Sequence, residues 1–238
     1  MERGDSPIQG RGASFNPPNR FLQFHFESDP DLESDLLDPD DHPSPKTQFF
    51  IDSSESILTH NDSPDIGMFV GINPYRGCEH GCIFCFARPT HEYLVFSAGV
   101  DVETKIVIKP RAPELLRKEL SSPRWTPQTV TMSGNVDCYQ PVERRLQITR
   151  KCLEIFAEFK NPVAIITKNH LVTRDIDLLQ KLAAVNAAAV FISVTSLNPD
   201  ITNVMEPRTA RPHRRLDAIR QLSQAGIPVG VMVAPIIP

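Results

Sequence analysis

Three cysteines stand within eight residues of one another, Cys78, Cys82 and Cys85, in the run Arg-Gly-Cys-Glu-His-Gly-Cys-Ile-Phe-Cys-Phe. This C-x3-C-x2-C spacing brings three thiolates to one compact loop and supplies no local fourth. Cysteine thiolates hold iron–sulfur clusters, and four cysteines are usual. A three-cysteine loop therefore predicts a [4Fe–4S] cluster in which one iron stays open to bind a substrate or a cofactor.

A structural zinc site is the first alternative. Such a site takes four ligands, and His80, His91 or Cys138 is a candidate to complete it, but the usual paired C-x2-C layout is absent. Disulfides are disfavoured, because five cysteines make an odd count, no secretory signal is visible and the chain is no small cysteine-dense scaffold. We therefore expect reduced thiols and a cytoplasmic location.

The 238 residues, 40% of them hydrophobic, suffice for one α/β domain, and no apolar run approaches the roughly 18 to 20 residues of a membrane helix. Charge is uneven along the chain. Residues 1–66 carry four Lys and Arg against 14 Asp and Glu, whereas the remainder carries 21 against 15. The lead-in is therefore acidic at −10 and the body basic at +6.

Residues 1–66 are predicted to be mostly a disordered acidic segment, because residues 28–43 mix acids with prolines and offer little apolar surface to bury. Two parts are expected to differ. Residues 19–26 carry Phe21, Phe24 and Phe26, which are candidates to dock on the domain, and residues 47–58 are a candidate start of the ordered body.

Residues 67–238 alternate strand-like and helix-like segments, which favours βα units and a parallel sheet. The predicted strands are Met68–Ile72, Lys105–Ile108, Thr129–Met132, Val163–Thr167, Ala189–Val194 and Val229–Ala234. The predicted helices are Ala112–Leu120, Val142–Phe159, Thr173–Ala184 and Arg211–Ala225. In β/α barrels the chemistry lies on loops at the carboxyl ends of strands, and the cysteine loop follows the first predicted strand.

The cysteine spacing, with aromatic Phe84 before the third cysteine, resembles the radical S-adenosylmethionine (SAM) superfamily. The resemblance extends over residues 66–238 to its spore photoproduct lyase, or DNA repair photolyase, branch and to that branch's uncharacterised bacterial relatives. It is carried by residues 73–78, 133–137, 167–168, 206–208, 214–216 and 226–235, and by Ser193. It implies a partial (β/α)6 barrel of the TIM type. It also implies a reduced [4Fe–4S] cluster that cleaves SAM to a 5′-deoxyadenosyl radical, which takes hydrogen from a substrate.

The resemblance also implies roles for single residues. Cys78, Cys82 and Cys85 would bind the cluster, and Phe84 would lie against the adenine. The remaining predicted SAM-binding residues are Ser133, Gly134, Asn135, Asp137, Lys168, Ser193 and Arg208. Each also has an ordinary structural interpretation, such as an exposed lysine, an Asx-turn at Asp137 or a local ion pair in Glu206-Pro207-Arg208.

Cys138 is a candidate catalytic residue, because photoproduct lyases use a cysteine of this loop as hydrogen donor. In those lyases the donor cysteine stands just before the turn that corresponds to Ser133. The residues just before Ser133 here are Thr131 and Met132, so the cysteine is missing at that place, which counts against thymine-dimer repair. Cys152 is expected to be a core residue. The arginine-rich cluster at Arg208, Arg211, His213, Arg214 and Arg215 is compatible with phosphate, but no aromatic stripe accompanies it, so nucleic acid is one open substrate class.

Other functions stay open at this stage: an iron–sulfur binding or redox-sensing protein without SAM chemistry, and a zinc-stabilised nucleic-acid module. The radical SAM interpretation needs an electron donor such as flavodoxin or ferredoxin. The chain stops at Pro238 directly after the sixth predicted strand, which predicts a truncated barrel with that strand's outer face uncovered. The substrate, its product and the fate of SAM are not encoded in any motif that we recognise.

Overall fold

The larger sheet of the protein has six strands within residues 8, 10–21, 46–62 and 69–236, which the computed structural model describes. Its strands follow the order β2-β3-β6-β7-β8-β9. They are β2 (Leu58–His60), β3 (Val70–Ile72), β6 (Val130–Met132), β7 (Val163–Thr167), β8 (Ala188–Ser193) and β9 (Val229–Met232). The strands from β3 to β9 run parallel, and β2 pairs antiparallel with β3 at the edge. This confirms a mixed α/β fold whose main sheet is parallel.

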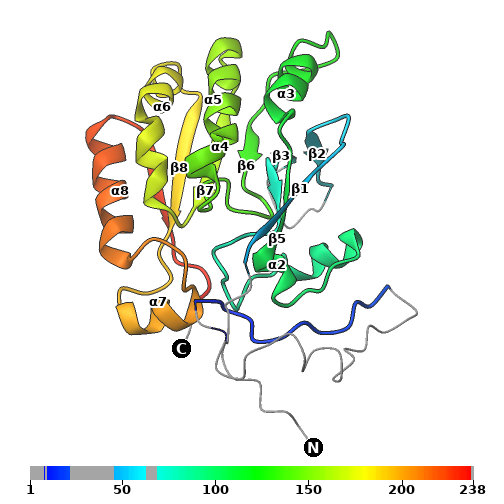
Figure 1. Cartoon of the computed structure of the whole chain (residues 1–238). Helices are drawn as coiled ribbons and strands as arrows, with labels where there is room; N and C mark the ends of the chain where they lie inside the picture. The colour runs from blue at the N-terminus through cyan, green and yellow to red at the C-terminus, as the bar shows by residue number, and fades with distance from the viewer. Residues whose placement is uncertain (1–7, 9, 22–45, 63–68, 237–238) are drawn as a thin grey trace, which may run out of the picture.

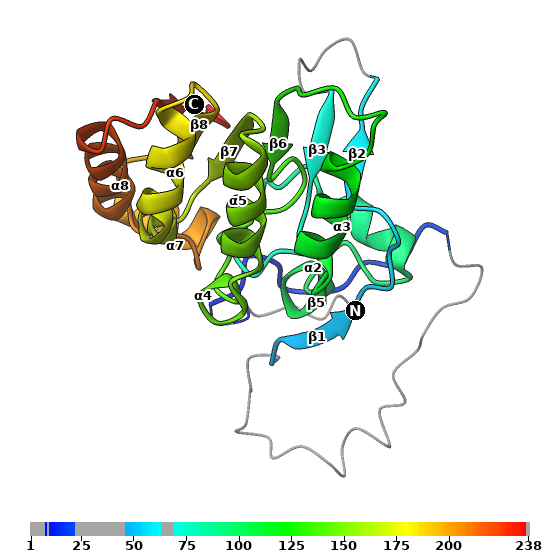
Figure 2. The same cartoon turned by 90° about the horizontal axis from the view of Figure 1, so that it is seen from above.

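Helices cover one face of this sheet (Figures 1 and 2). They are α3 (Ala112–Leu120), α5 (Ile148–Phe159), α6 (Ile176–Ala183) and α8 (Pro212–Gln224). Each strand turns alternate residues to them, so that Val163 and Ile165 of β7 are buried while Ala164 is not. The helices pack apolar stripes against the sheet, such as the one that contains Leu115 and Leu116 of α3. The core lies between the two layers.

The opposite face of the sheet is hollowed. A cavity of about 580 Å³ is lined by Phe69, Gln128, Thr129, Thr131, Ala164, Ile166, Phe191 and Met232. Five of these residues, Thr131, Ala164, Ile166, Phe191 and Met232, lie on the face of β6, β7, β8 and β9 that points away from the helices, and the other three precede β3 and β6. The sheet therefore has a packed outer face and an open inner one.

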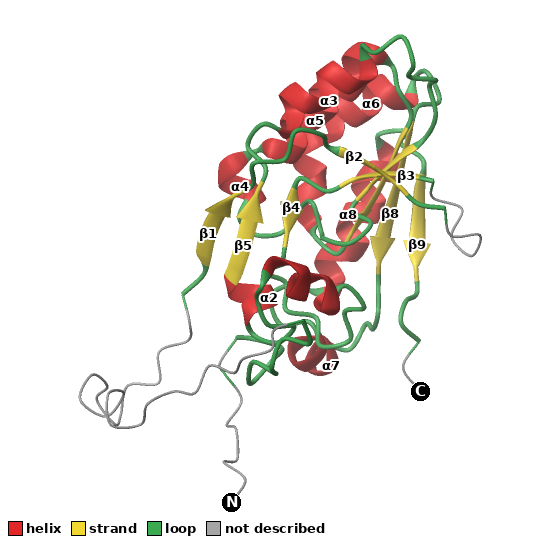
Figure 3. Ribbon diagram, turned by 90° about the vertical axis from the view of Figure 1, so that its right-hand side faces the viewer, coloured by secondary structure: helices red, strands yellow, loops and turns green. Residues whose placement is uncertain are grey.

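The strand Lys105–Ile108 (β5) forms where it was predicted, but it does not join the main sheet. It lies between β1 (Gln48–Ile51) and β4 (Tyr75–Arg76) in a separate three-stranded sheet, which Figure 3 shows apart from β8 and β9. Because β1 takes one edge of β5 and β4 takes the other, no edge is left to pair with β3. The prediction that Lys105–Ile108 forms the second strand of the barrel is therefore wrong.

Two predicted helices are interrupted. The segment Val142–Phe159 divides into α4 (Glu143–Leu146) and α5, because Gln147 between them has a left-handed backbone with φ of 54°. The buried Glu143 carboxylate accepts the backbone N–H of Thr149 at 3.0 Å and so caps α5 after the break. Similarly, Thr173–Ala184 begins inside a 3-10 turn, η2 (His170–Asp175), that precedes α6.

Parts of the acidic lead-in are structured, including residues 47–58, where the ordered body was expected to begin. Residues 10–21 run beneath α2 (Asp101–Thr104), in blue in Figure 1, and residues 46–62 contain β1 and β2. Phe21 stacks on Tyr93 with ring centroids 4.9 Å apart, although 55% of Phe21 stays exposed. Phe24 and Phe26 lie outside the described residues.

Two more short helices complete the fold: η1 (Arg88–Leu94), after the cysteine loop, and α7 (Pro199–Met205), between β8 and α8. At the far edge, Val231 of β9 is 53% exposed and Val233 beyond it 60%. No helix of the described part of the chain is long and apolar enough to cross a membrane.

Candidate functional site

The three cysteines lie on the loop between β4 and η1, near α2 and the end of α7. The Cys78 N–H donates to the Val102 carbonyl at 2.8 Å, and the N–H of Ile83 donates to the carbonyl of Met205 in α7 at 3.0 Å. Gly77 enters the loop with φ of 75°, and a Cβ there would lie 3.0 Å from the Lys105 and Val102 carbonyls. Packing against two helices thus fixes the loop, and all three thiols keep partial exposure.

Residues 10–21, which we call the N-terminal strap, hold the same loop from the other side. The backbone N–H groups of Gly12 and Ala13 donate to the two carboxylate oxygens of Glu103 at 3.0 and 2.9 Å. A Cβ on Gly12 would lie 1.8 Å from the carbonyl oxygen of Gly81. Only a glycine therefore allows the strap to approach the loop this closely.

Glu103 links the strap to the backbone of Cys82 through one arginine. Its carboxylate is fully buried and pairs with the Arg88 guanidinium at 2.6 Å. Arg88 in turn donates to the Cys82 carbonyl from Nε at 3.1 Å and from Nη2 at 2.9 Å, and to the Gly99 carbonyl at 3.0 Å. A charge-assisted network of this kind fixes the orientation of the second cysteine.

Asp137 occupies the centre of a second network behind the loop. Its carboxylate accepts the Thr167 hydroxyl at 2.8 Å and the Lys168 N–H at 2.7 Å, and it lies 3.3 Å from Nδ1 of His80. Burial alone would raise the pKa of Asp137, but the His80 charge and these hydrogen bonds hold it below its usual range. For His80, burial is likewise outweighed by Asp137, which raises the pKa of His80 to about 10.

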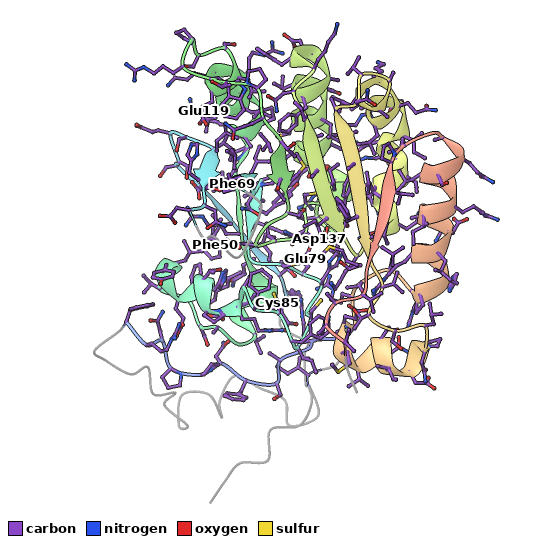
Figure 4. All side chains as sticks on the ribbon, turned by 180° about the vertical axis from the view of Figure 1, so that it is seen from behind. Phe50, Phe69, Glu79, Cys85, Glu119 and Asp137 are labelled. Atoms are coloured by element: carbon purple, nitrogen blue, oxygen red, sulfur yellow. The ribbon has the colours of Figure 1, made fainter. Side chains whose placement is uncertain are left out.

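This arrangement gives Asp137 a positioning role. It ties the end of β7 to the His80 segment of the cysteine loop. Figure 4 shows Asp137, Glu79 and Cys85 toward the same end of the molecule, with Glu119 at the other. The predicted contact of Asp137 with SAM stays a prediction.

The predicted residues of the Ser133 loop differ in accessibility. Ser133 is buried, and its hydroxyl accepts the N–H of Cys138 at 2.8 Å, which closes the loop on itself. Gly134 has open space where a Cβ would stand, and Asn135 is exposed, its N–H donating to the Asn73 side chain at 3.2 Å. Gly134 and Asn135 are thus the members of this loop that a ligand can reach.

Cys138 has no exposed surface and belongs to the core cluster. Burial raises the pKa of its thiol well above the usual value, and its carbonyl accepts the Thr149 hydroxyl at 2.7 Å. A hydrogen donor must reach the substrate, and this thiol does not reach any surface. Cys152 is also fully buried in the core, as predicted.

Lys168 and Phe84 meet beside the cysteines. The Lys168 ammonium lies 5.7 Å from the centroid of the Phe84 ring, within cation–π range. Burial raises the pKa of the Cys82 and Cys85 thiols, and the Lys168 charge opposes the shift at both. The carboxyl end of β7 therefore carries a cation to the cysteine loop.

Ser193 and Arg208 are both engaged within the protein. Ser193 is buried at the end of β8, where its carbonyl accepts Nη1 of Arg215 at 3.1 Å. Arg208 pairs with Glu79 at 3.3 Å, and its N–H donates to the His80 carbonyl at 3.2 Å. Arg208 thus binds residues 79 and 80 of the cysteine loop, and the local ion pair considered for Glu206-Pro207-Arg208 is not formed, because Glu206 pairs with Arg215.

Arg215 does not belong to the predicted phosphate-compatible cluster. Its side chain is fully buried and pairs with buried Glu206 at 2.6 Å. It also donates to the Ala210 carbonyl at 2.7 Å. An arginine enclosed in this way crosslinks β8 to the start of α8 and is not available to a ligand.

Sequence reasoning missed Glu103, Arg88 and the strap. Glu79 and Gln140 were missed as well: the Glu79 N–H donates to Gln140 at 3.0 Å, and the Glu79 carboxylate accepts the Val142 N–H at 2.8 Å. A sequence signal for Glu79 did exist, because Glu79 and His80 lie between the predicted cluster ligands Cys78 and Cys82. No comparable signal marked Glu103, whose partners in the strap lie about 90 residues away in the sequence.

The donor set suits an iron–sulfur cluster. Three partly exposed thiols share one fixed loop, with a lysine beside them and Arg88 bonded to the backbone at Cys82. No three His, Cys, Asp or Glu side chains in the described ranges come close enough together to hold a single metal ion.

Comparison with known proteins supplies the family. The sequence model of the Radical SAM superfamily matches residues 72–238. An uncharacterised protein of Mycobacterium tuberculosis is 38% identical over 167 residues, which are 70% of this chain and 49% of that protein. An uncharacterised protein of Methanocaldococcus jannaschii is 27% identical over 167 residues, 70% of this chain and 60% of that one. The chain thus spans about half to three fifths of the length of these curated relatives.

Solved structures agree on the fold. Spore photoproduct lyase complexed with dinucleoside spore photoproduct superposes with a TM-score of 0.59 at 17% identity, over 79% of this chain and 52% of that one. A mutant of the same lyase with bound AdoMet and dinucleoside spore photoproduct gives 0.58 at 17% identity, over 79% and 50%. Because the match of the family model covers well over half of the sequence, this chain belongs to the radical SAM superfamily, whose cofactors are a [4Fe–4S] cluster and SAM.

Proposed function

We propose that this chain forms the cluster-binding and SAM-binding part of an enzyme that acts by hydrogen abstraction. The observation that carries the proposal is the placement of Cys78, Cys82 and Cys85 beside Lys168 and Phe84, where β7 ends. When bound and reduced, the cluster supplies the electron that cleaves SAM to a 5′-deoxyadenosyl radical, which takes hydrogen from a substrate. The parallel strands from β3 to β9 support a partial barrel of the (β/α)6 type, with β5 outside it.

The chain's own residues would orient SAM. Lys168 is the cation that the structure holds beside the cysteine loop, so it is our candidate to pair with the SAM carboxylate. Phe84 offers a ring for the adenine, and Gly134 and Asn135 are the reachable part of the neighbouring loop. Ser133 and Asp137 would support these contacts indirectly, because their side chains are occupied within the protein. Arg208 pairs with Glu79, and Ser193 is buried, so neither is our first candidate to contact SAM.

For the reaction, we propose a lyase that acts on modified or damaged nucleic acid. The support is the fold shared with a lyase solved with dinucleoside spore photoproduct, together with the basic body of this chain. Cys138 is not assigned the hydrogen-donor role, because it is fully buried. The reaction therefore needs a different donor from the one that this loop supplies in photoproduct lyases.

The partners follow from the chemistry. A [4Fe–4S] cluster must be reduced before SAM is cleaved, so the proposal includes an electron donor such as flavodoxin or ferredoxin. It also places the enzyme in the cytoplasm, where thiols stay reduced.

The test is 5′-deoxyadenosine formation after anaerobic reconstitution with iron and sulfide, in the presence of SAM and dithionite. The parent protein should yield the nucleoside. Cys82→Ala should yield none, whereas Cys152→Ala, which removes a buried thiol away from the loop, should retain the activity. A brown, reconstituted parent protein that forms no 5′-deoxyadenosine would contradict the proposal.

A further inference from the structure

A pocket lined by arginines lies behind the cysteine loop and has no part in the chemistry described above. Its volume is about 850 Å³. Its cationic side chains come from four elements: Arg144 of α4, Arg174 of η2, Arg208 of the turn after α7, and Arg211 and Arg214 at the start of α8. No Asp or Glu is among its lining residues.

Two of these arginines have no fixed partner. Arg144 and Arg211 are exposed and make no ion pair or side-chain hydrogen bond to any described residue. A protein surface normally scatters such charges or balances them. Here both face one pocket that already holds three other guanidinium groups, so their mutual repulsion favours an anionic ligand.

The other three arginines are held in place from behind. Arg174 pairs with Glu143 and Asp175, both at 2.8 Å. Arg208 uses one Nη2 bond to Glu79 at 3.3 Å and retains other N–H donors. Arg214 donates to His170 at 3.1 Å. These contacts orient the guanidinium groups without covering the pocket.

The pocket adjoins the cluster loop. Nδ2 of Asn169, a lining residue, lies 3.3 Å from Nε2 of His80, and the Arg208 N–H bonds to the His80 carbonyl. A ligand held in the pocket would therefore lie one residue away from the segment that separates Cys78 from Cys82, with Asn169 and Arg208 between them.

We propose that this arginine pocket binds the phosphate groups of a polyanionic ligand. Several guanidinium groups around one volume match a ligand with more than one phosphate, since each guanidinium can bond a phosphate through two N–H groups. A nucleic-acid strand is one source of such phosphates and a nucleoside polyphosphate is the other. The choice of nucleic acid rests on the proposed function, whereas the phosphate site itself does not.

The test compares the reconstituted full chain with Arg144→Ala/Arg211→Ala by fluorescence anisotropy, without SAM or reductant. The probes are a labelled single-stranded oligothymidylate and a labelled ATP analogue. Neither substitution strands a buried carboxylate, so the variant should fold. The matched control is Lys118→Ala/Arg124→Ala, which removes two exposed charges from the region of α3.

The expected result is a loss of affinity of about tenfold per arginine in the pocket variant and little change in the control. For the oligonucleotide, the slope of log affinity against log salt should shrink by about 1.4, the share of two phosphate contacts. Arginine-dependent binding of the oligonucleotide supports a nucleic-acid source, and binding of the ATP analogue alone supports a nucleoside polyphosphate.

Equal affinity in parent and pocket variant, or no binding of either probe, would overturn the proposal. Because binding is measured without SAM cleavage, a protein that forms no 5′-deoxyadenosine but still shows the arginine dependence would refute the proposed function and leave the phosphate site standing.

Discussion

Substitution of Glu103 by Gln tests whether the N-terminal strap and Arg88 support the cluster loop. The change keeps the side chain's shape but removes the buried charge that pairs with Arg88 at 2.6 Å. Breaking a buried pair from one side costs about 3 to 5 kcal/mol. Because Gln keeps one oxygen to accept an N–H from the strap, we expect the lower end, about 3 kcal/mol.

At roughly 2 to 4 °C per kcal/mol for a chain of this size, that loss should lower Tm by about 6 to 12 °C. Iron bound per chain after reconstitution should fall as well, since Arg88 would no longer hold the Cys82 carbonyl from two nitrogens. Thermal unfolding and iron analysis of the same preparations measure both effects.

The matched control is Glu114→Gln, whose partner Arg111 is 59% exposed and whose own side chain is 66% exposed. Screened pairs of this kind contribute little, so this variant should behave like the parent. A second variant, Arg88→Lys, keeps the charge but loses the planar fork that reaches the Cys82 and Gly99 carbonyls. Arg88→Lys should reduce the iron bound per chain, while its Tm should fall less than that of Glu103→Gln. Parental Tm and parental iron content in Glu103→Gln would refute the reasoning.

Three further predictions concern single residues. Arg215→Leu should destabilise the protein by about 3 to 5 kcal/mol in denaturant titrations, because it leaves buried Glu206 unpaired; unchanged stability would show that the pair is dispensable. Lys168→Ala should weaken SAM binding, measured by calorimetry on reconstituted protein, by about tenfold or more if one charge-assisted contact is lost, whereas equal affinity would remove Lys168 from the SAM site. Burial lowers the pKa of His91 to about 4. As pH falls from 6.5 to 4, the unfolded chain therefore binds a proton before the folded one, and the free energy of unfolding should decline by up to about 3 kcal/mol. His91→Gln should show a smaller decline over the same pH range than the parent.

The parts of the fold that sequence reasoning found are those with a local signal. The cysteine spacing identifies the loop, and the strand Val163–Thr167 and the helix Ala112–Leu120 have the bounds that their apolar patterns predict. The barrel position of Lys105–Ile108 was wrong because strand formation is local and strand pairing is not. Its partner β1 lies more than 50 residues earlier, inside residues 47–58, which were expected to begin the ordered body but carry no signal of the strand with which they pair.

Charged residues that are buried in the fold were the most misleading. Arg215 looks like a solvated helix residue between Arg214 and Leu216, yet Arg215 is fully buried while Leu216 is 48% exposed. Glu103 is equally ordinary in sequence. In both cases a partner of opposite charge, 15 residues away for Glu103 and nine for Arg215, makes burial possible. The sequence spacing matches no helical i, i+3 or i, i+4 pair, so it does not indicate which partner that will be.

Contacts cross the boundary expected after residue 66. The strap supplies two N–H donors to Glu103, and β1 supplies an edge to β5, so residues on both sides of that boundary build one support. Without the strap, the buried Glu103 carboxylate would keep only Arg88, and Gly81 would lose the backbone that packs against its carbonyl. The geometry of the three cysteines therefore depends on two short segments before residue 66, the strap and β1, which carry none of the chemistry themselves.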